Sequence, residues 1–555
     1  LTVWANTNGI FGLRDSLARV LGLRPGDIQV IQTFVGGSFG GRGHDNNALV
    51  CALLAMRARR PVRLINRREE DFIATRPRMP MQLWMRLGFK RDGLLSGKEI
   101  KVIADNGAYA GLGAPVASVA TLRHDNMFTN RDIRGELTVV HTNKIPTGAF
   151  RGFGNPSGQW AMQQMIDIGA RALGLDPRDV LLKNLIDGKH TSPHGAVIYS
   201  CEVKECVRQA AQLIGWDEKR AHRQPNRGLG IAASCMVSGK RSHHYDGSSG
   251  IVIVNGDGTV QVLSGEGETG PGSRTVLAQI VAEELGVRYE DVAVSAADTA
   301  TTAFAFGTHA SRSTYIAGNA ARDAARKARE QLLEVAAEML EASAADLEIK
   351  GGVVSVRGVP PEARSLTVGE VATRALFRPG GGPISAVGGW DPPSTDLDKE
   401  WYGNESGAYN FCAQAVEVEV DPESGHVKVL NMTMASDAGT VIHPVACEGQ
   451  NEGALAQGLG YAYIEQPQIE GGRVENPSLA GYRIPCLADM PPFRQVFVPS
   501  YEPTGPFGAK GVGQIGLDPT APAIANAIYD AVGVRVTQLP ISPEKVWQVL
   551  QEKHT

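Results

Sequence analysis

Glycine-rich loops between strands and helices constrain the fold of this chain more than any other feature of its sequence. The chain of 555 residues contains 65 glycines. Many of them form short clusters that follow an apolar strand pattern and precede a helical one. Such alternation is typical of an α/β (α+β) protein whose backbone segments approach one another closely. At this length the chain has room for two or more domains with well-buried cores.

One local pattern recurs along the chain. A helical stretch ends in Leu-Gly or Val-Gly, a short strand follows, and a glycine loop often comes next, as in residues 21–41 and 285–311. Helix–Gly–strand succession is common in any α+β protein. Its recurrence before two glycine loops favours two related halves that jointly hold one ligand.

Turn-rich stretches indicate where the domains meet. We expect a first domain at 1–190, a linker with one helix at 191–227 and a second domain at 228–555. The second domain is expected to contain a hairpin with the turn Asn255-Gly256-Asp257-Gly258. A long amphipathic helix is expected at 319–342. Residues 379–394, rich in Gly and Pro, are expected to form a loop.

Charge, hydropathy and cysteine usage exclude several classes of protein. The net charge of -4 gives no reason to expect nucleic acid or an anionic membrane as a partner, and no apolar run approaches the ~18 residues of a membrane span. The seven cysteines contain no C-x-x-C pair, which argues against an iron–sulfur cluster or structural zinc in this chain. We expect a cytoplasmic protein, with the periplasm as the alternative. Because residues 1–5 already read as a strand, we expect an upstream piece to have been removed or to be supplied by another chain.

Three of the glycine loops carry side chains suited to a bound ligand. The loop at 34–42 could hold an oxyanion with its backbone amides, although a tight turn is at least as common. Arg151 lies among glycines at a strand-to-helix turn, where an arginine either binds an anion or pairs with a surface carboxylate. Glu266 and Glu268 precede a helix, where carboxylates serve acid–base chemistry or simply favour the helix dipole.

In their order along the chain, these segments resemble the motifs of the molybdenum hydroxylases, the xanthine oxidase family. The resemblance covers essentially the whole chain and rests on residues 39–41, 149–154, 268–272, 310–314, 452–460 and 508–514. It implies two large mixed domains that clasp a molybdenum–molybdopterin cofactor, with the cytosine dinucleotide form as one candidate. It also implies that the usual preceding hammerhead-like domain is missing here, to be supplied by another chain. Iron–sulfur and FAD groups would be in separate subunits rather than in this chain.

Position by position, the resemblance assigns roles to individual residues. Phe39, Arg151 and Ala310 are expected beside the molybdenum through their backbones, with no side-chain ligand to the metal. The other positions that it assigns to the cofactor are Asn8, Gly37, Gly40, Gly270, Ser311, Ser313, Gln450 and Gly511. The positions that it assigns to the substrate are Phe153, His44 and Ser234.

The chain departs from the family pattern at three places. Pro271 replaces a glutamine that usually contacts the cofactor. Gly43 and His44 occupy the region where purine-oxidising members carry a substrate-binding glutamate. Gln514 stands where the family has a glutamate as general base, and an amide does not ionise near neutral pH.

Three functions therefore remain open. The first is a hydroxylase or dehydrogenase of a cyclic or heteroaromatic substrate, with water as the oxygen source and with His44, Glu266 or Glu268 as the proton acceptor. The second is a hydratase that adds water to the activated C=C bond of a cyclic enone with the same cofactor. The third is a non-catalytic subunit that carries the cofactor. In the first two, Gln514 is the expected catalytic residue and orients water or substrate through its amide.

Overall fold

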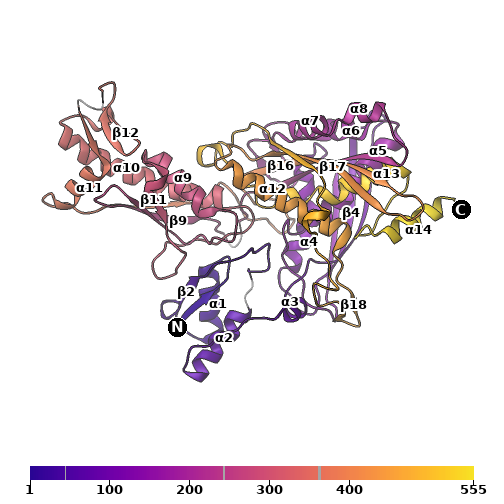
Figure 1. Cartoon of the computed structure of the whole chain (residues 1–555), viewed down its shortest axis with the longest axis horizontal. Helices are drawn as coiled ribbons and strands as arrows, with labels where there is room; N and C mark the ends of the chain where they lie inside the picture. Colours follow the sequence, from indigo (N-terminus) through magenta and orange to yellow (C-terminus); the bar gives the residue numbers. More distant parts are fainter. Residues whose placement is uncertain (44–45, 242–243, 361–363, 555) are drawn as a thin grey trace.

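The computed structural model describes residues 1–43, 46–241, 244–360 and 364–554. Three regions are visible in Figure 1: an N-terminal region below, an elongated lobe at the upper left, and a larger body at the right. The mixture of helices and strands confirms the predicted fold class. No helix of the described ranges is long and apolar enough to cross a membrane.

The N-terminal region is a small parallel strand pair with helices beside it. The strand expected at the start of the chain is confirmed as β1 (Thr2–Ala5), which pairs in parallel with β2 (Gln29–Gln32). Its helices are α1 (Ile10–Leu21), α2 (Asn46–Ala58) and α3 (Arg68–Ala74). The loop at 33–43 therefore leaves the end of β2, where a ligand-binding loop is expected.

A mixed sheet forms the centre of the body. Its strands, in spatial order, are β20 (Phe493–Phe497), β17 (Val427–Asp437), β16 (Tyr409–Val420) and β8 (Arg227–Val237). Alternate residues of β8 belong to different cores: Ile231 and Ala233 pack with α7 (Val203–Ile214), and Ala232 packs with α13 (Thr520–Val532). Since side chains alternate across a strand, the sheet is covered on both faces. The helix expected within the linker is thus part of this core.

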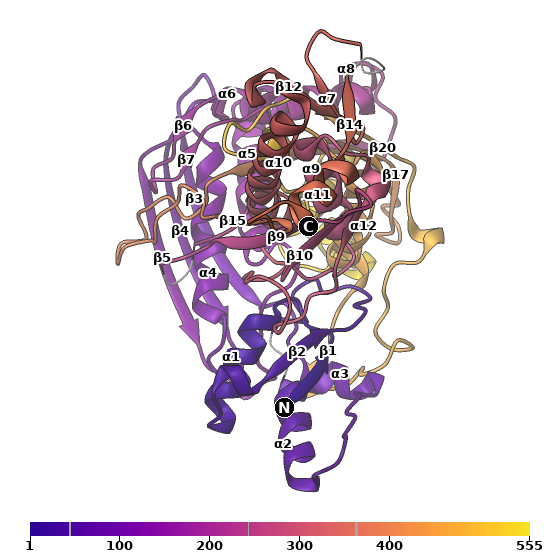
Figure 2. The same cartoon turned by 90° about the vertical axis from the view of Figure 1, so that its left-hand side faces the viewer.

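A second sheet borders the body. It consists of β3 (Met81–Phe89), β4 (Leu95–Asp105) and β5 (Ile133–Val140). Figure 2 shows it along one edge of the molecule, with α4 (Gly113–Leu122) against its inner side. The long helix α5 (Asn155–Ala172) packs between β3 and α13, so the turn that precedes α5 lies at the junction of both sheets. The small strands and helices around the body are β6 (His190–Thr191), β7 (Val197–Ile198), β18 (Ile469–Glu470), β19 (Arg473–Val474), α6 (Pro177–Asn184), α8 (Trp216–Ala221), α12 (Pro444–Leu459) and α14 (Pro543–His554).

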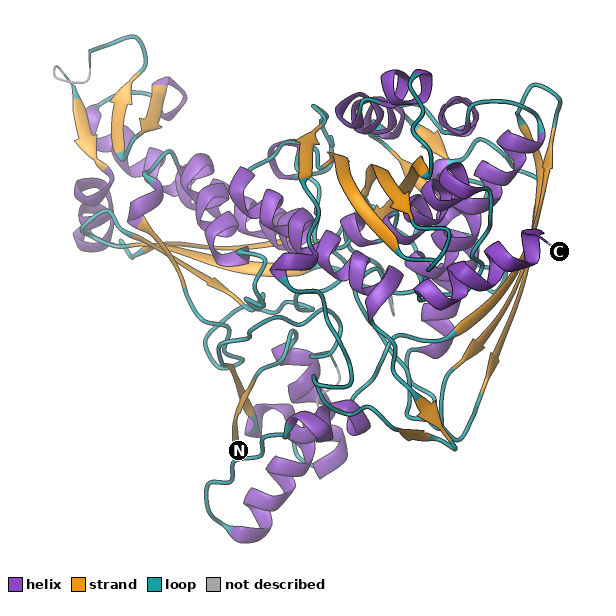
Figure 3. Ribbon diagram, turned by 45° about the vertical axis from the view of Figure 1, so that its right-hand side comes forward, coloured by secondary structure: helices purple, strands orange, loops and turns teal. Residues whose placement is uncertain are grey.

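The elongated lobe is a sheet covered by two helices (Figure 3). Its strands, in spatial order, are β11 (Val292–Val294), β10 (Val260–Ser264), β9 (Ser248–Val254) and β15 (Ile384–Trp390). The hairpin predicted at 255–258 is confirmed, because β9 and β10 pair antiparallel across it. The covering helices are α9 (Ser273–Leu285) and α10 (Gly318–Leu340), and the far end carries β12 (Leu347–Lys350), β13 (Val353–Val356), β14 (Ser365–Thr367) and α11 (Val368–Phe377).

The loop predicted at 379–394 is wrong in its central part, which forms β15. This strand pairs with β9 over its whole length. The glycines that indicated a loop have a different role, since a Cβ atom on Gly388 would clash with the α10 backbone at Ala324. Gly388 lets the helix lie directly on the strand.

A buried ion pair fixes the glycine loop that carries Gln514. Lys510 donates from Nζ to Asp437 Oδ2 at 2.7 Å and to the Ser200 carbonyl at 3.0 Å. Both charged side chains are 0% exposed. Asp437 ends β17, so the pair attaches the loop to the central sheet.

We predict that Lys510→Met lowers the free energy of unfolding by about 3–5 kcal/mol, because it leaves the buried Asp437 carboxylate without its cation. Denaturant unfolding measures this change. Lys144→Met is the matched control, since Lys144 pairs with Asp105 at 2.6 Å while 43% exposed, and its loss should cost about 0–1 kcal/mol. Equal losses in both variants would contradict the structural role of Lys510.

Candidate functional site

Four loops that are far apart in the sequence converge between the lobe, the N-terminal region and the body. They are residues 36–43, 148–154, 307–313 and 508–515. A Cβ atom on Gly40 would clash with the carbonyl group of Ala149, and one on Gly511 would clash with the carbonyl oxygen of Ser311. Each pair of loops therefore approaches as closely as backbone allows, and glycine is required for it.

The Arg151 guanidinium joins three segments at the centre of this junction. Its Nε donates to the Gly513 carbonyl at 2.8 Å, and one terminal nitrogen donates to the Gln450 carbonyl at 2.9 Å and to the Gln450 amide oxygen at 3.3 Å. The other terminal nitrogen donates to the Gln457 amide oxygen at 3.3 Å. Gln450 and Gln457 belong to α12, so this arginine ties the 148–154 turn to α12 and to the loop of Gln514.

The positive charge of Arg151 has no carboxylate in contact among the described residues. Arg151 is 4% exposed, and burial lowers its pKa to about 10, against a smaller opposing effect of the Asp518 charge. The group stays charged at neutral pH. An unpaired buried cation of this kind suits an anionic ligand better than a surface carboxylate.

Backbone strain collects at the predicted contact residues. Phe39, Phe153, Ala310 and Ser311 have φ values of 48°, 59°, 49° and 55°, in the left-handed region that non-glycine residues rarely adopt. Such residues cluster at active sites and ligand clamps, where neighbouring structure holds them in place. Phe39 is also 48% exposed, which leaves its ring free to cover a ligand.

Four buried polar atoms in these loops have no hydrogen-bond partner within the described ranges. One is Arg312 Nε, which faces the Asp246 carboxylate at 3.4 Å. The others are the hydroxyl oxygens of Ser38 and Ser311 and the amide oxygen of Gln514. A buried polar atom without a partner costs free energy. The three oxygens therefore fit a ligand that carries hydrogen-bonding groups of its own.

Asn8 connects two of the loops. Its side-chain amide donates to the Thr308 carbonyl at 3.2 Å, and its backbone N–H donates to the Arg42 carbonyl at 3.3 Å. Gly37, at φ 108°, lies against the ring of Phe39. Both predicted cofactor residues thus belong to the junction.

Two other predicted cofactor residues, Ser313 and Gly270, lie where the elongated lobe meets the junction. Ser313 donates its hydroxyl to Glu266 at 2.5 Å. Gly270 is exposed, with open space where a side chain would be.

The two carboxylates considered as proton acceptors are occupied by internal contacts. Glu266 accepts from Ser313 and lies 3.5 Å from the Arg312 guanidinium, with both charged groups fully buried. Glu268 accepts from the backbone N–H groups of Gly270, at 2.8 Å, and Arg274, at 3.2 Å. Glu268 is therefore a cap for the start of α9.

Two histidines complete the set of side chains considered for the site. The other proposed acceptor, His44, lies outside the described residues. His309, whose segment read only as a source of hydroxyls and amides, has its ring 6.4 Å from that of Phe306, edge to face.

Ser234 lies beneath the junction rather than in it. Its side chain is completely buried, and its hydroxyl donates to Asp518 Oδ2 at 3.1 Å and accepts from Asn155 Nδ2 at 3.0 Å. Ser234 therefore supports the segment that follows the 148–154 turn, and in this structure its side chain is not accessible to a substrate. The sequence analysis missed Asn155 and Asp518, although an acid in the apolar stretch that follows Gln514 was a usable signal.

Gln514 is the first residue before a short 3₁₀ helix, Ile515–Leu517, that leads into α13. The loop on its N-terminal side is held by Ser238, whose hydroxyl accepts from the Gly511 N–H at 3.0 Å, and by Asn410, which donates to the Gly511 carbonyl. On the other side, Gln414 donates to the Gly516 carbonyl at 2.7 Å. The backbone of Gln514 is thus fixed on both sides, while its amide oxygen has no hydrogen-bond partner in the described part of the chain.

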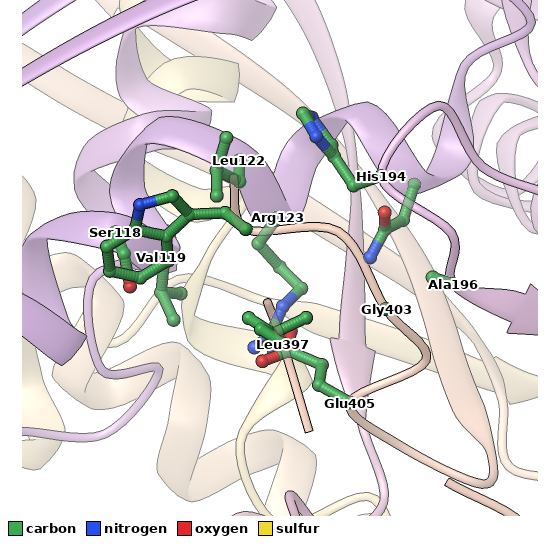
Figure 4. Close-up of a pocket in the computed structure, with 11 residues that line it drawn as sticks. Ser118, Val119, Leu122, Arg123, His194, Ala196, Leu397, Gly403 and Glu405 are labelled. Carbon is green, nitrogen blue, oxygen red and sulfur yellow. Dashed lines mark hydrogen bonds and ion pairs between the residues drawn. The ribbon is translucent and has the colours of Figure 1, made fainter. Parts of the chain in front are cut away.

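A small cavity of about 20 Å³ lies elsewhere in the body, between residues 118–126 and the segment 397–405 (Figure 4). Arg123 donates to Glu405 at 2.6 Å beside it. The charges of Arg123 and Lys240 hold the pKa of the buried Glu405 at about 2, against the effect of burial. A space of this size holds about one water molecule, so the junction of the four loops remains the candidate site.

Comparisons with known proteins find relatives over nearly the whole chain. Two family profiles, each described as a molybdopterin cofactor-binding domain, match residues 1–185 and 209–491. The xanthine dehydrogenase molybdenum-binding subunit of Escherichia coli is 32% identical, over 99% of this chain and 73% of its own. The 6-hydroxypseudooxynicotine dehydrogenase complex subunit gamma of Paenarthrobacter nicotinovorans is 30% identical, over 99% and 70%. The crystal structure of quinoline 2-oxidoreductase from Pseudomonas putida 86 superimposes with a TM-score of 0.90 at 28% identity, over 99% of this chain and 72% of that one.

We predict that Arg151→Lys loosens the loop at 508–516. One ammonium group cannot reproduce the fork of donors that reaches Gly513, Gln450 and Gln457 at once. Hydrogen–deuterium exchange of the 508–516 amides should rise about tenfold, as for the loss of about one charged hydrogen bond.

The matched control is Arg86→Lys on β3, where the arginine side chain is 71% exposed. Exchange of the 508–516 amides should not change in this variant. A wild-type exchange rate in Arg151→Lys would show that Arg151 does not hold the loop.

Proposed function

The chain is a molybdopterin-binding subunit of the xanthine oxidase family, and on that premise we propose that it hydroxylates or dehydrogenates a small cyclic or heteroaromatic substrate with water as the oxygen source. The observation that carries the proposal is the junction of four loops, three of them with strained residues, around an Arg151 charge that has no carboxylate in contact among the described residues. Its relatives are molybdenum oxidoreductases. The aromatic rings of Phe39 and Phe153 favour a flat, largely apolar substrate.

The residues of the junction fit a molybdenum–molybdopterin cofactor. Its phosphate-bearing tail is anionic and its pterin carries several donors and acceptors, which match the Arg151 charge and the unpaired oxygens of Ser38, Ser311 and Gln514. When bound, the cofactor supplies the redox centre at which oxygen is transferred. The residues that would hold it are Asn8, Gly37, Phe39, Gly40, Arg151, Gly270, Ala310, Ser311, Ser313, Gln450 and Gly511, with the cytosine dinucleotide as the proposed form of the tail.

Gln514 would orient the reacting water or the substrate. Its amide both donates and accepts hydrogen bonds, and its oxygen has no partner among the described residues. It cannot take up the proton as a glutamate would. The proton therefore passes to another group. His309, two positions before Ser311, does not suit that role, because burial and the charge of Arg312 lower the pKa of its imidazole to about 3.

Electrons would leave through partner subunits. One relative is named as the gamma subunit of a dehydrogenase complex and another as a molybdenum-binding subunit. We propose an iron–sulfur subunit and an FAD subunit as partners, and the cytoplasm as the compartment on the cysteine usage of the chain.

Hydration is the second candidate function, and the neutral amide at position 514 is the observation that favours it. An oriented water can add to an activated C=C bond without net electron transfer. Gly43 and His44 stand where purine-oxidising members of the family carry a substrate-binding glutamate, which argues against a purine in either case.

Reduction of an electron acceptor during turnover distinguishes hydroxylation from hydration. The purified complex is given quinoline-type heteroaromatics and cyclic enones with an artificial electron acceptor. We predict one two-electron reduction per product molecule, with oxygen from labelled water in the product. Product formed without any reduction of the acceptor would contradict the oxidoreductase proposal and favour hydration.

We further predict that Gln514→Glu changes the pH profile of turnover and raises the oxidation rate by about 10² or more, since a positioned general base contributes about 10²–10⁴. Gln514→Asn, which stays neutral, is the control and should keep the wild-type pH profile. If the glutamate variant also keeps that profile, residue 514 takes no part in the reaction.

A further inference from the structure

Asp518 is a buried acid that does not take a direct part in the reaction proposed above. It follows Gln514 by four residues and is 1% exposed. Its Oδ2 accepts from Asn155 Nδ2 at 2.6 Å and from the Ser234 hydroxyl at 3.1 Å. Asn155 is the first residue of α5, and Ser234 lies on β8. The carboxyl group therefore joins the segment after Gln514 to the helix and the strand beneath the 148–154 turn.

The second oxygen of the carboxyl group lies against the turn itself. A Cβ atom on Gly152 would clash with Asp518 Oδ1. Gly152, at φ 84°, separates Arg151 from Phe153. Only a glycine permits this approach, so the position of the carboxyl group limits where the two neighbouring site residues can lie.

A guanidinium group, that of Arg78, also contacts the turn. The Arg78 guanidinium donates to the Arg151 carbonyl at 2.8 Å and to the Phe153 carbonyl at 3.2 Å. It also stacks on the rings of Phe150, at 4.5 Å, and Tyr461, at 4.8 Å. The turn is thus held by a guanidinium group as well as by a carboxyl group.

The carboxyl group is only partly compensated. Oδ1 has no hydrogen-bond partner among the described residues. Burial raises the pKa of Asp518 to about 7, against the effects of Asn155, Ser234 and the charges of Arg78 and Arg123. The other titratable groups that interact with it are Arg151 and the thiols of Cys235 and Cys412.

We propose that Asp518 is a positioning residue whose ionisation controls how firmly the turn with Arg151 and Phe153 is held relative to Gln514. Ionised, the carboxylate accepts hydrogen bonds from the Asn155 amide and the Ser234 hydroxyl, but its buried charge is only partly compensated by Arg78 and Arg151, which favours opening of the turn to water. Protonated, it carries no buried charge, and the closed turn is favoured. Its effect on turnover rests on the proposed function, whereas its effect on the protein itself does not.

Asp518→Asn is the test variant, because asparagine has the same shape and still offers an oxygen to Asn155 and Ser234 but cannot ionise. The native carboxyl group keeps its proton up to about pH 7, while in the unfolded chain it loses the proton near pH 4. Between these values this group makes the wild type less stable as pH rises. The melting temperature of Asp518→Asn minus that of wild type should therefore increase from pH 5 to pH 8, by roughly 2–5 °C.

The control is Asp187→Asn, whose carboxylate is 79% exposed. Its difference in melting temperature from wild type should stay constant over the same pH range. A constant difference for Asp518→Asn as well would overturn the proposal, since it would mean that Asp518 contributes shape alone.

Amide exchange measures the positioning itself. After correction for intrinsic rates, protection of residues 150–156 should be lower at pH 8 than at pH 6 in wild type, and equal at both pH values in Asp518→Asn. If the asparagine variant does not fold, Ser234→Ala replaces it: with one donor removed, the wild-type transition should move to higher pH. Protection that is independent of pH in wild type overturns the proposal.

Turnover is the third readout. The wild-type kcat should change near pH 7 while that of Asp518→Asn does not, with KM within about twofold. If no substrate is turned over, the proposed function fails, but melting and exchange still decide the role of Asp518. If turnover occurs and both proteins share one pH profile of kcat, the positioning role in catalysis fails while the family reaction stands.

Discussion

The hydrogen bonds of the Arg151 side chain are the constraint on which the candidate site depends. One buried guanidinium group binds oxygens from α12 and from the loop of Gln514, more than 290 residues further along the chain. A buried cation without these acceptors would be costly, so the two parts of the fold must be assembled before the arginine is satisfied. The close approaches at Gly40 and Gly511 and the strained residues Phe39 and Ala310 follow from the same assembly. The arrangement leaves the charge of Arg151 free of carboxylates in the described ranges, as a site for an anionic cofactor requires.

Local steric requirements made much of this predictable from the sequence. A glycine is needed wherever backbone meets backbone, so the order of glycine loops carried the family resemblance, and the family profiles confirm it. The hairpin at 255–258 and the long helix α10 follow from turn residues and from apolar periodicity. The arginine among glycines at 148–154 left an anion site and a surface ion pair both open from the sequence, and its burial in the fold excludes the surface pair.

Long-range pairing explains what the sequence analysis did not predict. The segment of β15 was predicted to be a loop because it is rich in glycine. In the fold, Gly388 allows close contact with α10, which no local pattern reveals. Ser234 was expected at the substrate, but its partner Asp518 is 284 residues away and turns it into a supporting group. Glu266 and Glu268 likewise look free in sequence and are occupied in the fold. The hydrogen-bond partners of these polar side chains therefore could not be predicted from the sequence and are seen only in the fold.

The most direct test of the central claim is the content of metal and pterin in the purified protein, produced in cells that synthesise the molybdenum cofactor. Metal analysis and the fluorescence of the oxidised pterin released on denaturation measure both. The four-loop junction predicts one molybdenum and one pterin per chain, released together only when the protein unfolds. Protein that is folded and free of both would contradict the assignment of the junction as a cofactor site.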